Sequence, residues 1–255
     1  METTLQRIAA CRPRCAAATA LLLLLLTPPL AALASETEAH LDKAPVNLGD
    51  KASLQRGARI FVNYCLTCHS AASMRYKRME DLGLSEDQIK DNLMFASEKV
   101  GNTMTVAMGS DEAKKWFGAA PPDLSVIARA RGADWLYTYL RSFYRDDSRP
   151  TGWNNTLFDK VAMPFVLYRQ QGEQVLKKGS LGDAHGAKML VLDKPGTMTE
   201  PEYDAMVGDL VNYLVYMGEP AQTTRVQVGV FVLLFLVLFL ALTYQLKKEF
   251  WKDVH

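Results

Sequence analysis

The sequence has little cysteine: four residues among 255, in the pairs Cys11/Cys15 and Cys65/Cys68. The first pair lies in an N-terminal stretch that has the pattern of a cleaved signal peptide, and the one remaining pair cannot build a disulfide framework. The chain also lacks a charge excess, with 29 Lys and Arg against 28 Asp and Glu. Nucleic-acid-binding surfaces usually bring a basic excess, so we expect no nucleic-acid partner. The sequence shows neither clear strand alternation nor internal repeats, which favours a mainly helical fold.

Residues 1–34 have the pattern of a secretory signal peptide. Three arginines precede an apolar run that ends at Pro28-Pro29. The run is about half of the ~20 residues that a membrane-spanning helix needs, which argues against an uncleaved anchor. A small-x-small cleavage site follows at 32–34, so we expect the mature chain to begin at Ser35 and to keep only the second cysteine pair.

A second apolar segment, residues 225–246, predicts a transmembrane anchor. Between Arg225 and Lys247 lie 21 residues without a formal charge. At about 1.5 Å per residue, a helix of that length spans a ~30 Å hydrocarbon core, and so long a run is rare in soluble cores. Lysines are concentrated in the tail, residues 247–255, which places the tail in the cytoplasm. Residues 35–224 then form a periplasmic domain on the inner membrane.

Capping patterns predict the helices of this domain. Asp50 can cap a helix over 51–65. Gly57 in its middle costs about 1 kcal/mol relative to alanine, a cost that is explained if another backbone crosses closely there. Capping boxes begin helices at Ser85 and Thr199, and Asp123 or Ser125 is expected to cap a third. Residues 145–164 are expected to form a long ordered loop, and residues 177–198 a second irregular region.

The stretch Cys65-x-x-Cys68-His69 carries the chemistry. A thioredoxin-like dithiol needs a βαβ setting, which this sequence lacks, and structural zinc needs four ligands that the chain does not supply at suitable spacing. The third use of the pattern is attachment of haem c, with two thioether bonds from the cysteines and the adjacent imidazole on the iron. In an exported chain without other cysteines, the pattern predicts one covalent haem c with His69 as an iron ligand.

The sixth iron ligand is less determined. A thioether opposite histidine raises the reduction potential and suits electron transfer. Methionines near the haem motif or on the stripe of the last soluble helix are excluded as too close or as core. Pro164 makes the chain at Met163 extended, which favours Met163. The candidates that stay open are Met94, Met104, Met108, Met163, Met189 and Met198.

The sequence resembles the cytochrome c1 family, in a proteobacterial form. The resemblance covers nearly all of the mature chain and includes "CLTCHS", "AKKWFGAAPPDLSVIARARG", "YLRSFYRDDSRPTGWNN", "VAMP" and "GTMTEPEYDAMVGDLVNYLVYMGEP". It implies a class I cytochrome c-like domain with extended loops and one C-terminal transmembrane helix. Phe165 departs from the family pattern, which has histidine or proline there, and Trp135 aligns only loosely.

The resemblance also implies roles for individual residues. Cys65 and Cys68 would carry the thioether bonds, and His69 and Met163 would be the axial ligands. Pro121 and Pro122 would line the haem edge, where a backbone carbonyl can fix the His69 ring. Arg131 would contact a haem propionate. His40 and His185 are expected to be surface residues.

The function implied is that of the haem c subunit of ubiquinol–cytochrome c reductase, the bc1 complex. The chain would pass electrons from the Rieske iron–sulfur protein to a cytochrome c, beside cytochrome b and within a dimeric complex. It would not be an enzyme by itself. A stand-alone membrane-anchored cytochrome c serving a terminal oxidase or reductase is the nearest alternative. A periplasmic thiol–disulfide oxidoreductase using Cys65 and Cys68, and an assembly factor that transfers haem, are alternatives of other classes.

Overall fold

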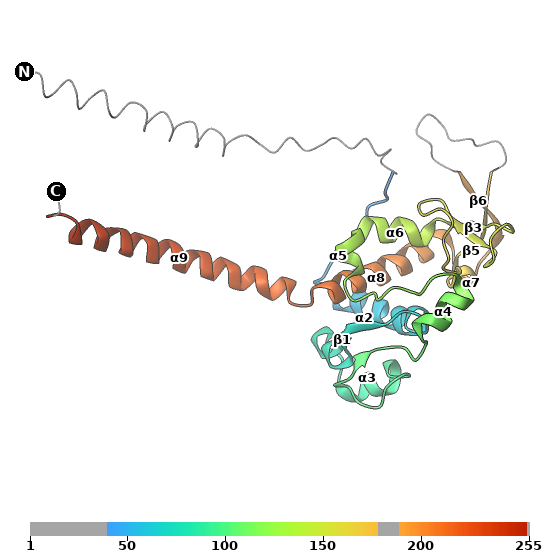
Figure 1. Cartoon of the computed structure of the whole chain (residues 1–255), viewed down its shortest axis with the longest axis horizontal. Helices are drawn as coiled ribbons and strands as arrows, with labels where there is room; N and C mark the ends of the chain where they lie inside the picture. Colours follow the sequence, from blue (N-terminus) through green and yellow to red (C-terminus); the bar gives the residue numbers. More distant parts are fainter. Residues whose placement is uncertain (1–39, 178–188, 254–255) are drawn as a thin grey trace, which may run out of the picture. The chain divides into compact units, whose positions relative to one another are not determined.

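A computed structural model describes residues 40–177 and 189–253. Within these residues the chain is mainly helical, as the sequence predicted (Figure 1). A π-helical turn follows the first helix at Phe61–Cys65, and a 3-10 helix covers Tyr76–Leu82. The α-helices are α2 (Lys51–Ile60), α3 (Glu86–Leu93), α4 (Ser110–Phe117), α5 (Ile127–Arg131), α6 (Ala133–Arg141), α7 (Tyr168–Gln171), α8 (Glu200–Gly218) and α9 (Gln222–Phe250). The predicted signal peptide and His185 lie outside the described residues, and His40 is exposed.

The mainly helical fold also contains short strands, which the sequence did not reveal. They form three antiparallel pairs in the described part of the chain, and one strand, Leu190–Pro195, falls in the region 177–198 that was expected to be irregular. Strands this short show no alternation that a sequence reveals, and β4 is buried along its whole length. The pairs are β1 (Ala71–Arg75) with β2 (Thr103–Met104), β3 (Phe143–Arg145) with β4 (Trp153–Asn155), and β5 (Gly172–Leu176) with β6 (Leu190–Pro195).

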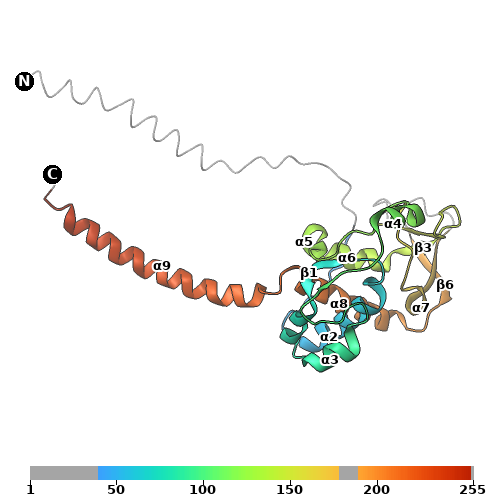
Figure 2. The ribbon, with the colours of Figure 1, turned by 60° about the horizontal axis from the view of Figure 1, so that its bottom comes forward.

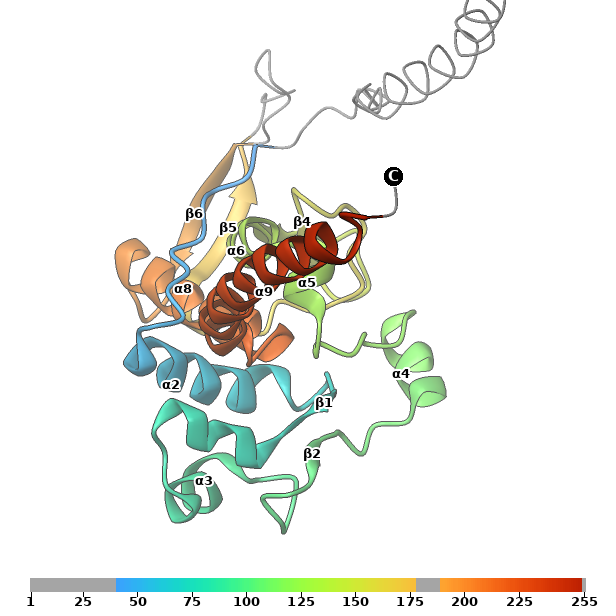
Figure 3. The ribbon, with the colours of Figure 1, turned by 90° about the vertical axis from the view of Figure 1, so that its left-hand side faces the viewer.

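Helices α2 and α8 cross at Gly57. A Cβ atom at this position would lie 2.1 Å from the backbone oxygen of Asp209 and 2.7 Å from the Cβ of Tyr213. Only glycine therefore lets the two backbones come this close, which confirms the close crossing that the sequence predicted. Figure 3 shows α2 beside α8, and α3 packs on the other side of α2, as Figure 2 also shows.

A buried amide fixes the same two helices at the start of α2. Asn212 of α8 is fully buried, and its side-chain Nδ2 donates to the carbonyl of Asn47 and to the hydroxyl of Ser53 at 2.9 and 3.0 Å. Its Oδ1 accepts from the N–H of Asn47 at 3.0 Å. Both the NH2 group and the oxygen of the Asn212 amide are thus hydrogen-bonded, so burying them costs little free energy. These hydrogen bonds also fix the register in which α2 and α8 cross.

Three of the predicted helix starts are confirmed and one is wrong. Asp50 accepts from the N–H of Ser53, and capping boxes are present at Ser85 and Thr199. Helix α5, in contrast, begins after Val126 without a side-chain cap. Asp123 accepts instead from the N–H groups of Ala72 and Ser125, because the segment before α5 packs against the segment that follows the cysteine pair.

Helix α9 contains the predicted anchor. The helix Thr224–Phe250 contains an 18-residue window with a mean hydropathy of 2.7, and it is the one helix in the described part of the chain that is long and apolar enough to cross a membrane. The helix continues past the predicted end at residue 246 and includes Lys247 and Lys248. A helix can extend into the lipid headgroup region with lysines that reach water, so its length fits a membrane span with a solvated end.

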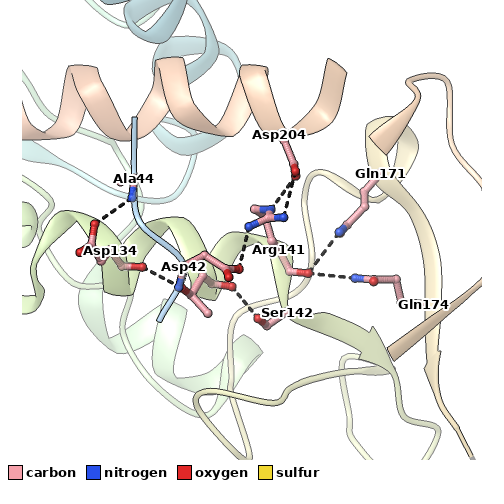
Figure 4. A network of polar contacts seen from close by, with 9 residues as sticks. Asp42, Ala44, Asp134, Arg141, Ser142, Gln171, Gln174 and Asp204 are labelled. Atoms are coloured by element: carbon pink, nitrogen blue, oxygen red, sulfur yellow. Dashed lines mark hydrogen bonds and ion pairs between the residues drawn. The ribbon is translucent and has the colours of Figure 1, made fainter. Parts of the chain in front are cut away.

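Arg141 joins α6 to its neighbours (Figure 4). Its Nε and Nη2 atoms donate to the two carboxylate oxygens of Asp204 on α8, at 2.5 and 2.9 Å, and Nη1 donates to Asp42 at 2.7 Å. The carbonyl of Arg141 accepts from the side-chain amides of Gln171 and Gln174. This charge-assisted fork holds the end of α6 against α8 and against the N-terminal segment.

We expect Gly57→Ala to lower the free energy of unfolding of the domain by about 1–3 kcal/mol, because α2 and α8 must separate to make room for the added methyl group. The direction of this change is informative, because in a helix without a close neighbour alanine would stabilise the helix by about 1 kcal/mol relative to glycine. Thermal unfolding of the purified full-length protein measures the effect. The control is Gly101→Ala, where a Cβ meets nothing within 4 Å. Equal melting temperatures for the two variants would contradict the close crossing.

Candidate haem site

The segment that holds Cys65, Cys68 and His69 forms a tight turn at the end of α2. The helix widens into the π-helical turn, in which the N–H of Leu66 donates to the carbonyl of Phe61 at 3.0 Å. Turns of this kind are rare and occur frequently at functional sites. The N–H groups of Cys68 and His69 then both donate to the carbonyl of Cys65, at 3.1 and 2.8 Å. The backbone therefore holds both thiols and the imidazole close together.

The His69 ring is oriented by a backbone carbonyl. Its Nδ1 lies 2.8 Å from the carbonyl oxygen of Pro122. A carbonyl oxygen only accepts, so Nδ1 carries the proton and Nε2 keeps its lone pair for a metal. Burial lowers the pKa of His69, which further favours the neutral imidazole. This contact matches the one that the family resemblance implied for the proline pair.

All seven predicted site residues line one cavity of about 320 Å³. They are Cys65, Cys68, His69, Pro121, Pro122, Arg131 and Met163. The cavity lies in the size range of small-molecule and cofactor pockets, and its walls are mostly aliphatic and aromatic. Two thiols, an imidazole and a thioether on an apolar cavity are the donor set that a covalently attached haem requires. The residues present therefore fit haem c.

Met163 is the one methionine of the described chain that lines this cavity. Met104 is fully buried elsewhere in the core, and Met189, directly before β6, is 51% exposed. Met206 and Met217 are buried in the core, as the sequence predicted. The placement leaves Met163 as the best candidate for the second axial ligand.

Arg131 lies at the rim of the cavity and is exposed. Its guanidinium carbon lies 5.1 Å from the centre of the Trp135 ring and 6.0 Å from that of Phe158. Both aromatic residues also line the cavity, so Trp135 belongs to the pocket despite its loose alignment. The stacked guanidinium has donors left for an anionic group at the cavity mouth.

Sequence reasoning missed an aromatic ladder beside Met163. Trp135 stacks on Tyr139 at 4.8 Å, Tyr139 meets Phe143 edge-on at 5.0 Å, and Phe143 stacks on Phe165 at 4.8 Å. The four-residue spacing of Trp135, Tyr139 and Phe143 in the sequence was the available signal, although only the first two lie on α6 and Phe143 lies in β3. Phe165, the departure from the family pattern, is thus a packing residue that fixes the chain two positions after Met163.

Cys65 does not have the environment of a nucleophilic thiol. Burial raises the pKa of Cys65 to about 12, with a smaller contribution from the neighbouring Cys68. Reactive dithiols have a lowered pKa, because the thiolate is the nucleophile. The alternative of a thiol–disulfide oxidoreductase is therefore not favoured.

The fold and this cavity define a membrane-anchored c-type cytochrome. A sequence model of the Cytochrome C1 family matches residues 42–254. The chain is 49% identical over 234 residues to a cytochrome c1 of Allochromatium vinosum, which covers 90% of this chain and 96% of that protein. It is 31% identical to a cytochrome c1 of Rhodospirillum rubrum over 80% of this chain and 83% of that one. A Nitrosomonas europaea protein named ammonia monooxygenase gamma subunit is 57% identical over 92% of this chain and 97% of that protein.

The chain belongs to the cytochrome c1 family. It is accordingly the electron-transferring haem c subunit of a bc1 complex, which also contains cytochrome b and a Rieske protein, and its cofactor is covalently bound haem c. It is anchored in a membrane. The stand-alone cytochrome is not favoured.

We expect Phe165→Ala to cost about 3–5 kcal/mol of stability, the usual range for truncating a buried aromatic residue. Phe165 is 2% exposed, whereas Phe95, the control residue, is 68% exposed. Denaturant unfolding of both variants, followed by the haem absorption, measures the difference. A Phe165→Ala variant as stable as Phe95→Ala would contradict the anchoring role of the aromatic ladder.

Proposed function

We propose that the haem c of this chain is bonded to Cys65 and Cys68, with His69 and Met163 as axial ligands, and that it carries single electrons from the Rieske protein to a cytochrome c. The cofactor supplies the change between ferrous and ferric iron. The observation that carries the proposal is the meeting of these four side chains at one apolar cavity, although Met163 is far from the other three in the sequence.

The residues of the chain have distinct parts in this function. The carbonyl of Pro122 keeps the proton on Nδ1 of His69, so that Nε2 would be the neutral donor to the haem iron. The thioether of Met163 raises the reduction potential relative to a second imidazole. The apolar walls exclude water and limit the reorganisation that an electron transfer requires. Arg131 is proposed to hold a propionate at the cavity mouth by a charge-assisted hydrogen bond.

The topology is proposed from the charge pattern. After cleavage behind residue 34, the domain 35–224 lies in the periplasm and stays attached to the membrane anchor that follows it. Residues 225–246 cross the inner membrane, and the lysine-bearing tail, 247–255, stays in the cytoplasm. A dimeric assembly and a cytochrome c acceptor follow from the family and belong to the same proposal.

We expect Met163→His to keep the covalent haem and to lower its midpoint reduction potential, because imidazole stabilises ferric iron more than a thioether does. In membranes supplied with ubiquinol, the c-type haem should then be reduced more slowly than in the unmodified protein. Redox titration and rapid-mixing spectroscopy measure the two effects.

The control is Met189→His, which places the same side chain on an exposed methionine. An unchanged potential in Met163→His would exclude Met163 as the ligand. A lowered potential with undiminished reduction by ubiquinol would instead contradict the proposed electron-transfer step.

A further inference from the structure

The hydroxyl of Tyr139 donates a hydrogen bond to the sulfur of Met163, with 3.5 Å between Oη and Sδ. We propose that Tyr139 is a positioning residue for the axial thioether and that this hydrogen bond raises the reduction potential of the haem. The inference rests on the proposed ligation by Met163. It assigns a role to a residue that sequence reasoning did not single out.

The ring of Tyr139 is held between two aromatic neighbours. Trp135 stacks on one side at 4.8 Å, and Phe143 meets the ring edge-on at 5.0 Å. A rotation that moved the hydroxyl away from Met163 would break both contacts, each worth roughly 0.5–1.5 kcal/mol beyond the area that it buries. The hydroxyl is therefore directed at the cavity by packing.

The backbone that carries Tyr139 is fixed as well. Its carbonyl accepts from the side-chain amide of Asn155 at 2.8 Å. The carbonyl of the next residue, Leu140, accepts from the hydroxyl of Tyr203 on α8, also at 2.8 Å. One residue further on, Arg141 makes its fork with Asp204 (Figure 4). Three consecutive residues of α6 are thus tied to their surroundings, which gives the donor a defined position relative to Met163.

A thioether sulfur has two lone pairs. One can bind a metal, and the other can accept a hydrogen bond. The hydrogen bond withdraws electron density from the sulfur and makes it a weaker donor. Ferric iron depends more on that donation than ferrous iron does, so the hydrogen bond disfavours the ferric state. Its removal should tighten the ferric iron–sulfur bond and lower the reduction potential.

The test is Tyr139→Phe in the full-length protein, purified with its haem from membranes. This change keeps the ring and its stacking and removes only the hydroxyl. The matched control is Tyr137→Phe on the same helix, whose ring packs against the guanidinium of Arg141 at 4.6 Å. The measurements are the midpoint potential, the red-region charge-transfer band of methionine-ligated ferric haem, and the melting temperature.

We expect the ratio of ferric to ferrous affinity for the thioether to rise two- to tenfold in Tyr139→Phe, and a tenfold change corresponds to a potential lower by about 59 mV for a one-electron couple. The charge-transfer band should persist to higher denaturant concentration than in the unmodified protein. Tyr137→Phe should change neither quantity. A Tyr139→Phe variant with an unchanged potential and band would overturn the proposal, even if its melting temperature falls, because a purely structural role lowers stability alone. Absence of the band from the unmodified protein would show instead that ligation by Met163 itself fails.

Discussion

The close crossing of α2 and α8 at Gly57 is the constraint on which the haem site depends. It fixes the direction in which α2 ends, and the π-helical turn there ends at Cys65, directly before the turn that holds Cys68 and His69. The same helix α8 contributes Leu210 and Leu214 to the cavity wall. One glycine therefore couples the segment with the cysteine pair and His69 to the apolar surface of the cavity. A side chain at Gly57 would push the end of α2 and the cavity wall formed by α8 apart.

The second wall of the cavity comes from chain segments far from the cysteine pair. The carbonyl of Pro122 orients His69, while α6 presents Trp135 and Tyr139, and the segment after β4 brings Met163. Phe165 stacks on Phe143 and thereby fixes the Met163 segment to the end of α6. The Arg141–Asp204 fork in turn holds α6 to α8. The two walls thus share α8 as a common support, which gives a rigid site that suits electron transfer without rearrangement.

Much of this arrangement could be predicted from local patterns. Asp50, Ser85 and Thr199 are helix caps whose effect extends over a single turn, so sequence alone located those helix starts. The cysteine–histidine motif is likewise local. The short strands, and the hydrogen bond that Asp123 accepts from Ala72, depend on contacts between distant segments and could not be predicted from a local sequence pattern. Met163 stood among six candidates until the family resemblance, because its function depends on tertiary position. The roles of Tyr139 and Phe165 required the packed structure.

The central claim is a haem c covalently held by this chain within a bc1 complex. The most direct measurement is a reduced-minus-oxidised visible spectrum of the tagged full-length protein, purified from membranes in mild detergent, before and after extraction with acidified organic solvent. The account predicts c-type and b-type bands together before extraction, and a c-type band that alone stays with the protein afterwards. A c-type band without any b-type band would contradict the bc1 assignment. Loss of all haem on extraction would contradict covalent attachment through Cys65 and Cys68.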